Sequence, residues 1–133
     1  GKILSIDIKK MDELKNVSFL QCDFLQESTK EKILNFFGEE LDVVLSDMAA
    51  DTTGNKSLDC IRTNKLCSDV IEFSSKILKP NGILVSKLFM GDDFLEVKEL
   101  AKSKFKKVEF FKPEASRSES KETYIHCAIL KTL

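Results

Sequence analysis

Short apolar runs recur along this chain, and several of them end in an acidic residue. The most compact run is residues 41–47, LDVVLSD, in which aliphatic side chains precede Asp47. A run of this kind is typical of a parallel strand that is buried on both faces. Similar runs predict further strands at residues 3–6, 17–21, 83–89, 108–111 and 122–130.

Between the strands, the spacing of the apolar residues predicts helices. Ser28 and Glu31 have the spacing of a capping box, and Gly38 is a typical helix end. The turn residues Pro80-Asn81-Gly82 end a longer helix and lead into the next strand. Because helices alternate with strands, an α/β fold with a mostly parallel sheet is expected. The helices are expected at residues 28–38, 60–78 and 94–101.

The last two predicted strands break this alternation. Only a polar segment, residues 113–121, separates Phe111 from Glu122. A parallel crossover needs a dozen or more residues, so these two strands are expected to be antiparallel neighbours. The last strand then begins at the edge where the parallel strands end. Glu122 is therefore expected to join Asp47 and Lys87 at that edge.

The composition is that of an ordinary soluble protein. The 133 residues are expected to form a single domain, with 42% hydrophobic residues and a net charge of −1. Any surface that binds nucleic acid must therefore be local. No apolar run approaches the ~20 residues of a membrane span, and no signal peptide is visible, so we expect a cytoplasmic protein without membrane association.

Cysteine and histidine, the usual zinc ligands, are few and scattered in this chain. The four cysteines show no CxxC spacing, and His126 is the only histidine, which argues against a zinc site. The cysteines are interpreted as buried, reduced thiols. They are Cys22, Cys60, Cys67 and Cys127.

Lys87 is the most informative residue in the sequence. A lysine within an apolar strand must either extend to solvent or pair with carboxylates. A structural buried ion pair is one interpretation of Lys87 with Asp47 and Glu122, and Asp47 alone could equally be a turn or helix-cap residue. The other interpretation is a site that binds a hydroxyl group and directs it at an electrophile.

Upstream acids indicate a nucleotide-like ligand. Asp7 ends a strand, where an acid commonly holds ribose hydroxyls, and Asp23 with Phe24 could bind an adenine. Other enzyme classes lack their motifs. There is no GxSxG, no Walker loop around Gly54, and no lysine four residues after Tyr124 for a short-chain dehydrogenase.

Six motifs occur together in one order. They are Ile6-Asp7-Ile8, Gln21-Cys22-Asp23-Phe24, Ser46-Asp47-Met48-Ala49, Leu78-Lys79-Pro80-Asn81-Gly82, Ser86-Lys87-Leu88-Phe89-Met90-Gly91 and Ser116-Arg117-Ser118-Glu119-Ser120-Lys121-Glu122-Thr123-Tyr124. Together they resemble the FtsJ-type ribose 2′-O-methyltransferases, which use S-adenosyl-L-methionine on RNA and have a Rossmann-like fold. The resemblance covers essentially the whole chain.

The resemblance implies roles for the acidic and basic residues. The last three members of the family's Lys-Asp-Lys-Glu tetrad fall on Asp47, Lys87 and Glu122. Asp7 and Asp23 would contact the cofactor's ribose and adenine, with Phe24 and Asp47 beside them. The implied substrate is ribosomal RNA, possibly within the large subunit, and the match is most similar to bacterial enzymes that methylate a uridine there.

The sequence also departs from the family pattern. Ala50 and Asn81 replace a common proline and a usual glycine. The family's first lysine, first strand and cofactor glycine loop all precede Gly1. We therefore expect an N-terminally truncated methyltransferase domain, inactive by itself, whose exposed strand edges could pair with another molecule.

The function predicted is methyl transfer to an RNA 2′-hydroxyl. A charged Lys87 would stabilise the developing oxyanion, because two neighbouring carboxylates favour the ammonium form. Two alternatives are a catalytically inactive RNA-binding module and a nucleotide-binding oxidoreductase. RNA is expected to contact a local basic surface, although a solvated rim of lysines would look the same. Its residues are Lys106, Lys107, Lys112, Arg117 and Lys121.

Overall fold

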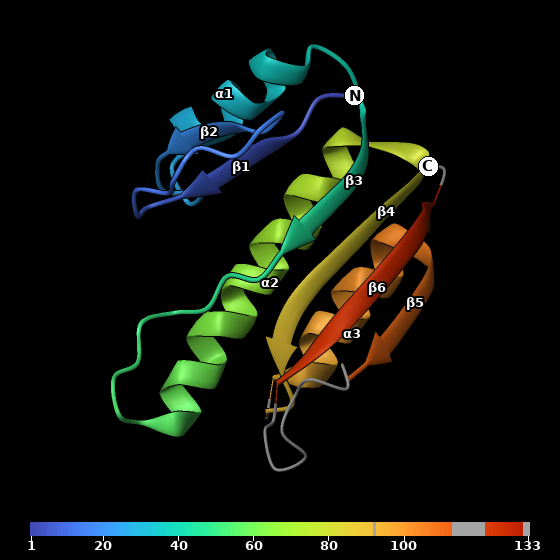
Figure 1. The fold of residues 1–133 in the computed structure, drawn as a ribbon. Helices are drawn as coiled ribbons and strands as arrows, with labels where there is room; N and C mark the ends of the chain where they lie inside the picture. Colours follow the sequence, from blue (N-terminus) through green and yellow to red (C-terminus); the bar gives the residue numbers. More distant parts are fainter. Residues whose placement is uncertain (92, 113–121, 132–133) are drawn as a thin grey trace. The chain divides into compact units, whose positions relative to one another are not determined.

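A computed structural model describes residues 1–91, 93–112 and 122–131 (Figure 1). The chain divides into two compact units, Gly1–Glu40 and Leu41–Leu133. Each unit carries part of the predicted α/β pattern.

The first unit is a parallel strand pair followed by a helix. β1 (Leu4–Asp7) pairs with β2 (Ser18–Gln21), with Asp7 opposite Gln21. α1 (Glu27–Phe37) follows. These elements confirm the predicted strands and helix.

The two ends of α1 differ in how well the sequence predicts them. Gly38 ends the helix as predicted, with a positive φ of 67° that suits glycine and an N–H donated to the Leu34 carbonyl over 2.9 Å. The predicted capping box is wrong. α1 begins before Ser28, and its N-cap residue, Gln26, makes no side-chain cap bond. The helix entry is held instead by the Thr29 hydroxyl, which donates to the Asp23 carbonyl over 2.6 Å.

The second unit contains a four-stranded sheet. Its order is β3-β4-β6-β5, with β3 parallel to β4 and β6 antiparallel to both β4 and β5 (Figure 1). The predicted antiparallel arrangement of the last two strands is confirmed. The strands are β3 (Leu41–Ser46), β4 (Leu78–Phe89), β5 (Phe105–Phe111) and β6 (Glu122–Leu130).

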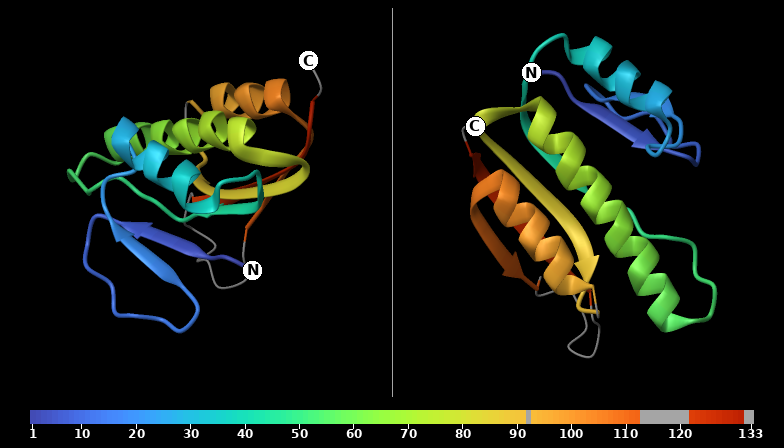
Figure 2. Two further views of the ribbon diagram at one scale, coloured as in Figure 1. Left: turned by 90° about the horizontal axis from the view of Figure 1, so that it is seen from above. Right: turned by 180° about the vertical axis from the view of Figure 1, so that it is seen from behind.

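Two helices cover one face of this sheet. α2 (Lys56–Ile77) and α3 (Phe94–Lys104) lie side by side on it (Figure 2). The core lies between these helices and the sheet. Cys67 and Cys127 belong to it, and their burial raises the pKa of the Cys67 thiol to about 11 and that of the Cys127 thiol to about 12. The buried core side chains include Cys67, Val70, Ile71, Leu84, Leu88, Val97, Ala101, Phe105, Ile125 and Cys127.

Several element boundaries differ from the prediction. α2 begins at Lys56 rather than near Cys60, because Asn55 caps it by accepting a hydrogen bond from the Leu58 amide over 3.1 Å. β5 begins at Phe105 rather than Val108. Local propensity near a helix–strand junction does not reveal which sheet neighbour will extend a strand.

The junction between α2 and β4 contains an irregular pairing. Leu41 of β3 pairs with Leu78 of β4, but Val43 pairs with Ile83. Two steps along β3 therefore match five along β4, so β4 carries three extra residues there. The residues Pro80-Asn81-Gly82, predicted as a turn outside the strand, lie within this irregular part of β4.

The prediction that β3 is buried on both faces is wrong for this structure. Val43 is 49% exposed and Leu45 is 74% exposed, whereas Leu41 is buried. α2 and α3 cover one sheet face, and alternate residues of a strand point to opposite faces. Val43 and Leu45 share the face without these helices.

Among the described residues, no helix has the length and apolar character that a membrane crossing requires.

Candidate active site

Three strands bring Asp47, Lys87 and Glu122 to one edge of the second unit's sheet. β3 and β4 are parallel and in register at Ser46 and Ser86, so Asp47 and Lys87 come next on neighbouring strands. β6 runs the other way and begins there, with Glu122 opposite Phe89. The carboxyl ends of parallel strands are where ligands bind in open α/β sheets.

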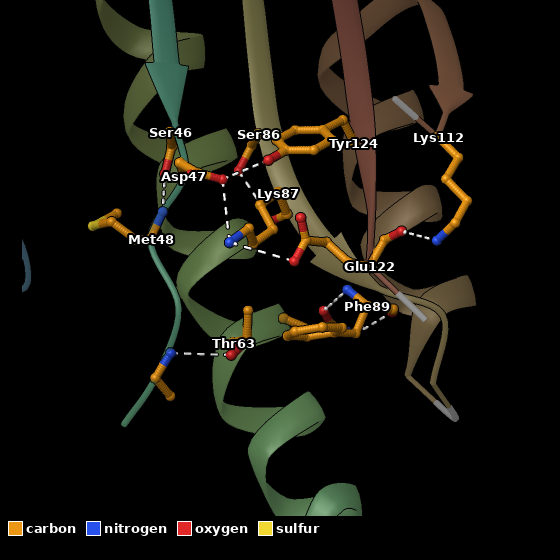
Figure 3. Close-up of polar contacts among 12 residues, drawn as sticks. Ser46, Asp47, Met48, Thr63, Ser86, Lys87, Phe89, Lys112, Glu122 and Tyr124 are labelled. Carbon is orange, nitrogen blue, oxygen red and sulfur yellow. Dashed lines mark hydrogen bonds and ion pairs between the residues drawn. The ribbon is translucent and has the colours of Figure 1, made fainter. Parts of the chain in front are cut away.

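The Lys87 ammonium lies between the two carboxylates (Figure 3). Its Nζ is 3.2 Å from Asp47 Oδ1 and 3.6 Å from Glu122 Oε2. The predicted meeting of these three side chains is therefore confirmed. The lysine side chain is only 14% exposed, whereas that of Asp47 is 72% exposed. The cluster thus holds a largely buried cation beside a carboxylate that solvent, or a ligand, can reach.

Tyr124 is a fourth member of the cluster, and its place there was not predicted from the sequence. Its hydroxyl donates a hydrogen bond to Asp47 Oδ1 over 2.6 Å (Figure 3). Its ring stacks on Phe111, with centroids 5.8 Å apart. The signal that could have found it is the register, because Tyr124 lies directly opposite Lys87 on the neighbouring strand.

Three of the predicted cofactor residues, Asp7, Asp23 and Phe24, lie in the first unit, at the carboxyl edge of β1 and β2, whereas the fourth, Asp47, belongs to the second unit. Asp7 ends β1, and Asp23 follows the end of β2. Each is exposed and accepts a backbone hydrogen bond two residues on, Asp7 from Lys9 over 3.1 Å and Asp23 from Leu25 over 2.9 Å. These turns fix both carboxylates at the edge, and a carboxylate has further acceptor capacity for hydroxyl or amino donors.

Phe24 has a less open environment than the two acids. Its ring is half-buried, and the Lys30 ammonium lies 5.5 Å from the ring centroid. A flat aromatic ligand on that face would have to share it with the ammonium.

The predicted basic surface is divided in the structure. The Lys112 ammonium donates to the Glu122 carbonyl over 2.9 Å, so this lysine lies at the same edge as Glu122 (Figure 3). Lys106 and Lys107 lie at the other end of β5, where Phe105 pairs with Leu130. They are adjacent in a strand and therefore point to opposite faces.

The structure therefore does not place Lys106, Lys107 and Lys112 on one surface near Asp47, Lys87 and Glu122. Lys107 also pairs with Glu109 over 3.6 Å. Arg117 and Lys121, the other predicted RNA contacts, lie outside the described residues.

The arrangement of motifs in the fold is matched by a known family. The sequence pattern of FtsJ-like methyltransferases matches residues 1–130. The chain belongs to this family.

Relatives with assigned names share much of the sequence. Ribosomal RNA large subunit methyltransferase E of Pelagibacter ubique is 44% identical over 131 residues, covering 98% of this chain and 64% of that protein. The protein of the same name from Rickettsia akari is 45% identical over 125 residues, which cover 94% of this chain and 55% of the Rickettsia protein. The chain thus spans between 55% and 64% of the length of these relatives.

Solved structures confirm the fold. A candidate ribosomal RNA methyltransferase of Plasmodium falciparum superposes with a TM-score of 0.83 at 26% identity, over 97% of this chain and 72% of that one. Human methyltransferase-like protein 13, solved in complex with SAH, gives a TM-score of 0.65 at 16% identity over 96% of this chain and 61% of that one. The latter likeness is one of fold alone.

Proposed function

We propose that this protein transfers a methyl group from S-adenosyl-L-methionine to a ribose 2′-hydroxyl of ribosomal RNA. The observation that carries the proposal is the Lys87 ammonium, held between Asp47 and Glu122 at the carboxyl edge of the sheet. Family membership and the names of the relatives support the reaction class and the ribosomal substrate. We further propose a uridine of large-subunit RNA as the target, and the cytoplasm as the place of action.

The chain's own residues suit the handling of a hydroxyl. Bound S-adenosyl-L-methionine supplies a methyl group on a sulfonium, which a 2′-oxygen can attack in line. Lys87 binds that oxygen and stabilises the negative charge that develops on it. Asp47 and Glu122 hold the ammonium in place. The exposed Asp47 carboxylate accepts a hydrogen bond from the hydroxyl and takes its proton as the oxygen gains the methyl group.

The acids of the first unit fit the cofactor's nucleoside. Asp7 and Asp23 present exposed carboxylates, which suit the hydroxyl donors of a ribose and the amino donor of an adenine. Phe24 follows Asp23 and offers an aromatic ring beside it. These roles are part of the proposal.

Two alternatives predict different behaviour. An RNA-binding module without catalysis would not need Lys87 between two carboxylates. A nucleotide-binding oxidoreductase of the short-chain type would need a lysine four residues after Tyr124, where Ala128 stands. Methyl transfer to ribosomal RNA by the full-length protein separates all three functions.

The test of the site compares two lysines of β4. We expect Lys87→Ala to lower turnover about 100-fold or more, because it removes the charge that stabilises the oxyanion, while cofactor affinity changes little. Lys79→Ala is the matched control, because Lys79 pairs with Asp42 of β3 over 2.8 Å at the opposite end of the same strand pair. Equal losses of turnover in the two variants, or equal losses of turnover and cofactor affinity in Lys87→Ala, would contradict the proposed role.

A further inference from the structure

Two buried polar residues lie next to each other on α2. Thr63 is 1% exposed and Asn64 is not exposed at all. A buried side-chain amide needs hydrogen-bond partners, because leaving it unpaired costs free energy. The partners of these two residues are segments of the chain that carry the candidate active site.

Asn64 binds both backbone groups of Phe89, the last residue of β4. Its Oδ1 accepts from the Phe89 amide over 2.7 Å, and its Nδ2 donates to the Phe89 carbonyl over 2.9 Å. The same Nδ2 donates to Asp93 Oδ1 over 2.8 Å. β3 pairs with β4 only as far as Ser46 and Ser86, so on that side Phe89 extends past the end of the neighbouring strand, while its other side faces Glu122 of β6. The Asn64 amide therefore takes the place of a neighbouring strand's peptide group.

Thr63 binds the other segment. Its hydroxyl accepts a hydrogen bond from the Ala50 amide over 3.0 Å (Figure 3). Ala50 lies three residues after Asp47 in the segment that leaves β3. One turn of α2 thus holds the chain just after Asp47 and the chain just after Lys87.

We propose that Asn64, with Thr63, is a positioning residue that sets the separation of Lys87 from Asp47; this rests on the proposed function. A lysine side chain is long and flexible, so its contact with Asp47 over 3.2 Å depends on where the two backbones are fixed. Asn64 fixes the end of β4 two residues beyond Lys87, and Thr63 fixes the segment beyond Asp47. Neither residue needs to touch the substrate.

A purely structural role would also make Asn64 sensitive to substitution. Asn64→Ala leaves the buried Phe89 amide without its partner and lowers stability. The two roles differ in what happens when Lys87 is absent. A positioning residue that acts through Lys87 has nothing left to position in Lys87→Ala, whereas a structural residue still matters there.

The kinetic experiment uses the full-length protein and four variants at a temperature where all are folded. Asn64→Ala should lower kcat about tenfold with little change in the KM for S-adenosyl-L-methionine. Val70→Ala, a core truncation on the same helix, should lose stability without losing kcat. In the Lys87→Ala background, Asn64→Ala should cause no further loss of kcat. Additive losses, or an equal loss of kcat in Val70→Ala, would overturn the inference.

A second variant covers the case in which Asn64→Ala does not fold. Thr63→Val keeps the side-chain shape and removes only the bond from Ala50. It should lower kcat severalfold in the wild-type background and not at all in Asp47→Ala. Additive losses in this pair would equally overturn the inference.

Amide hydrogen exchange separates the inference from the proposed function. Exchange at the Phe89 amide should become faster in Asn64→Ala than in Val70→Ala, because only the former removes its acceptor. Unchanged exchange at the Phe89 amide would reject the positioning role of Asn64 even if methyl transfer is normal. Absence of methyl transfer by the wild-type protein would reject the proposed function, whatever the exchange data show.

Discussion

Asp47 accepts two charged or polar donors through one oxygen. Tyr124 donates to Asp47 Oδ1 over 2.6 Å, and the Lys87 ammonium lies 3.2 Å from the same atom. The phenol thus orients the carboxylate that, in the proposed function, orients the lysine. Removing the phenol should loosen Asp47 without removing any charge from the cluster.

The ionisation of Tyr124 tests this contact. The hydrogen bond to Asp47 raises the pKa of Tyr124 above its ordinary value of 10.0, and burial and the charges of Asp47 and Glu122 raise it further. The folded protein therefore holds the phenolic proton more tightly than the unfolded chain does. The resulting stabilisation is fully present below pH 10 and is lost as the pH rises above that value.

We therefore expect the wild-type protein to lose stability above pH 10 more steeply than Tyr124→Phe does. A difference titration of phenolate absorbance between the two proteins isolates Tyr124, the only tyrosine of this chain. Phenolate formation close to pH 10 would show that the hydrogen bond to Asp47 does not persist in solution.

The sequence predicts some of the clustered residues and misses others for a definite reason. Asp47, Lys87 and Glu122 follow from strand ends and from the short link before the last strand, both of which are local patterns. Tyr124 depends on the register of β6 against β4, which no local pattern specifies. Asn64 reads as an ordinary polar position in a helix until its tertiary partners are known.

At the scale of elements, helix starts show where local chemistry decides the structure and where it does not. Asn55 caps α2 with its side chain and starts the helix at Lys56, although the apolar pattern predicted a start near Cys60. Ser28 has the expected capping spacing but lies inside α1. The spacing of a capping box alone therefore does not identify a helix start, because Ser28 lies within a helix whose N-cap is Gln26.

Substitutions of Asn55 and Ser28 are expected to change the free energy of unfolding by different amounts. Asn55→Ala should lower the free energy of unfolding by about 1 kcal/mol, because the Leu58 amide loses its acceptor. Asn55→Asp keeps a good cap and should cost little. Ser28→Ala should also cost little, because Ser28 is not the N-cap. Denaturant unfolding measures all three, and a loss for Ser28→Ala as large as that for Asn55→Ala would restore the predicted capping box.

The burial of β3 shows a further limit at this scale. An apolar run reports that a strand has hydrophobic side chains, and it does not report what covers each face. Val43 and Leu45 point away from the face that α2 and α3 cover, and both are exposed. The strand itself, its direction and its acidic end were all predictable from the run.

At the scale of the whole molecule, the basic residues predicted to contact RNA lie at both ends of β5, so only some of them lie near the candidate active site. Lys112 lies at the edge of the candidate active site, through its bond to the Glu122 carbonyl. Lys106 lies at the opposite end of β5. A strand residue adds about 3.3 Å, so the six residue steps from Lys106 to Lys112 separate the two lysines by about 20 Å.

Salt dependence of RNA binding distinguishes the two ends. Lys112→Ala should reduce the slope of log affinity against log salt by about one, because one phosphate contact is lost. Lys106→Ala, the matched control on the same strand, should leave the slope unchanged. A larger change for Lys106→Ala would mean that RNA follows the other end of β5.

The three extra residues of β4 separate the length of the chain at the α2–β4 junction from the orientation of Lys87 in the candidate active site. Strand side chains alternate between faces, so one residue inserted between Ile83 and Lys87 would turn the lysine to the wrong side of the sheet. The irregular part around Asn81 lies before the pairing of Val43 with Ile83, which restores the register. An insertion or deletion at Asn81 can therefore be absorbed where the ladder is already interrupted, and the α2–β4 junction is where homologous chains can differ in length while Lys87 keeps its orientation.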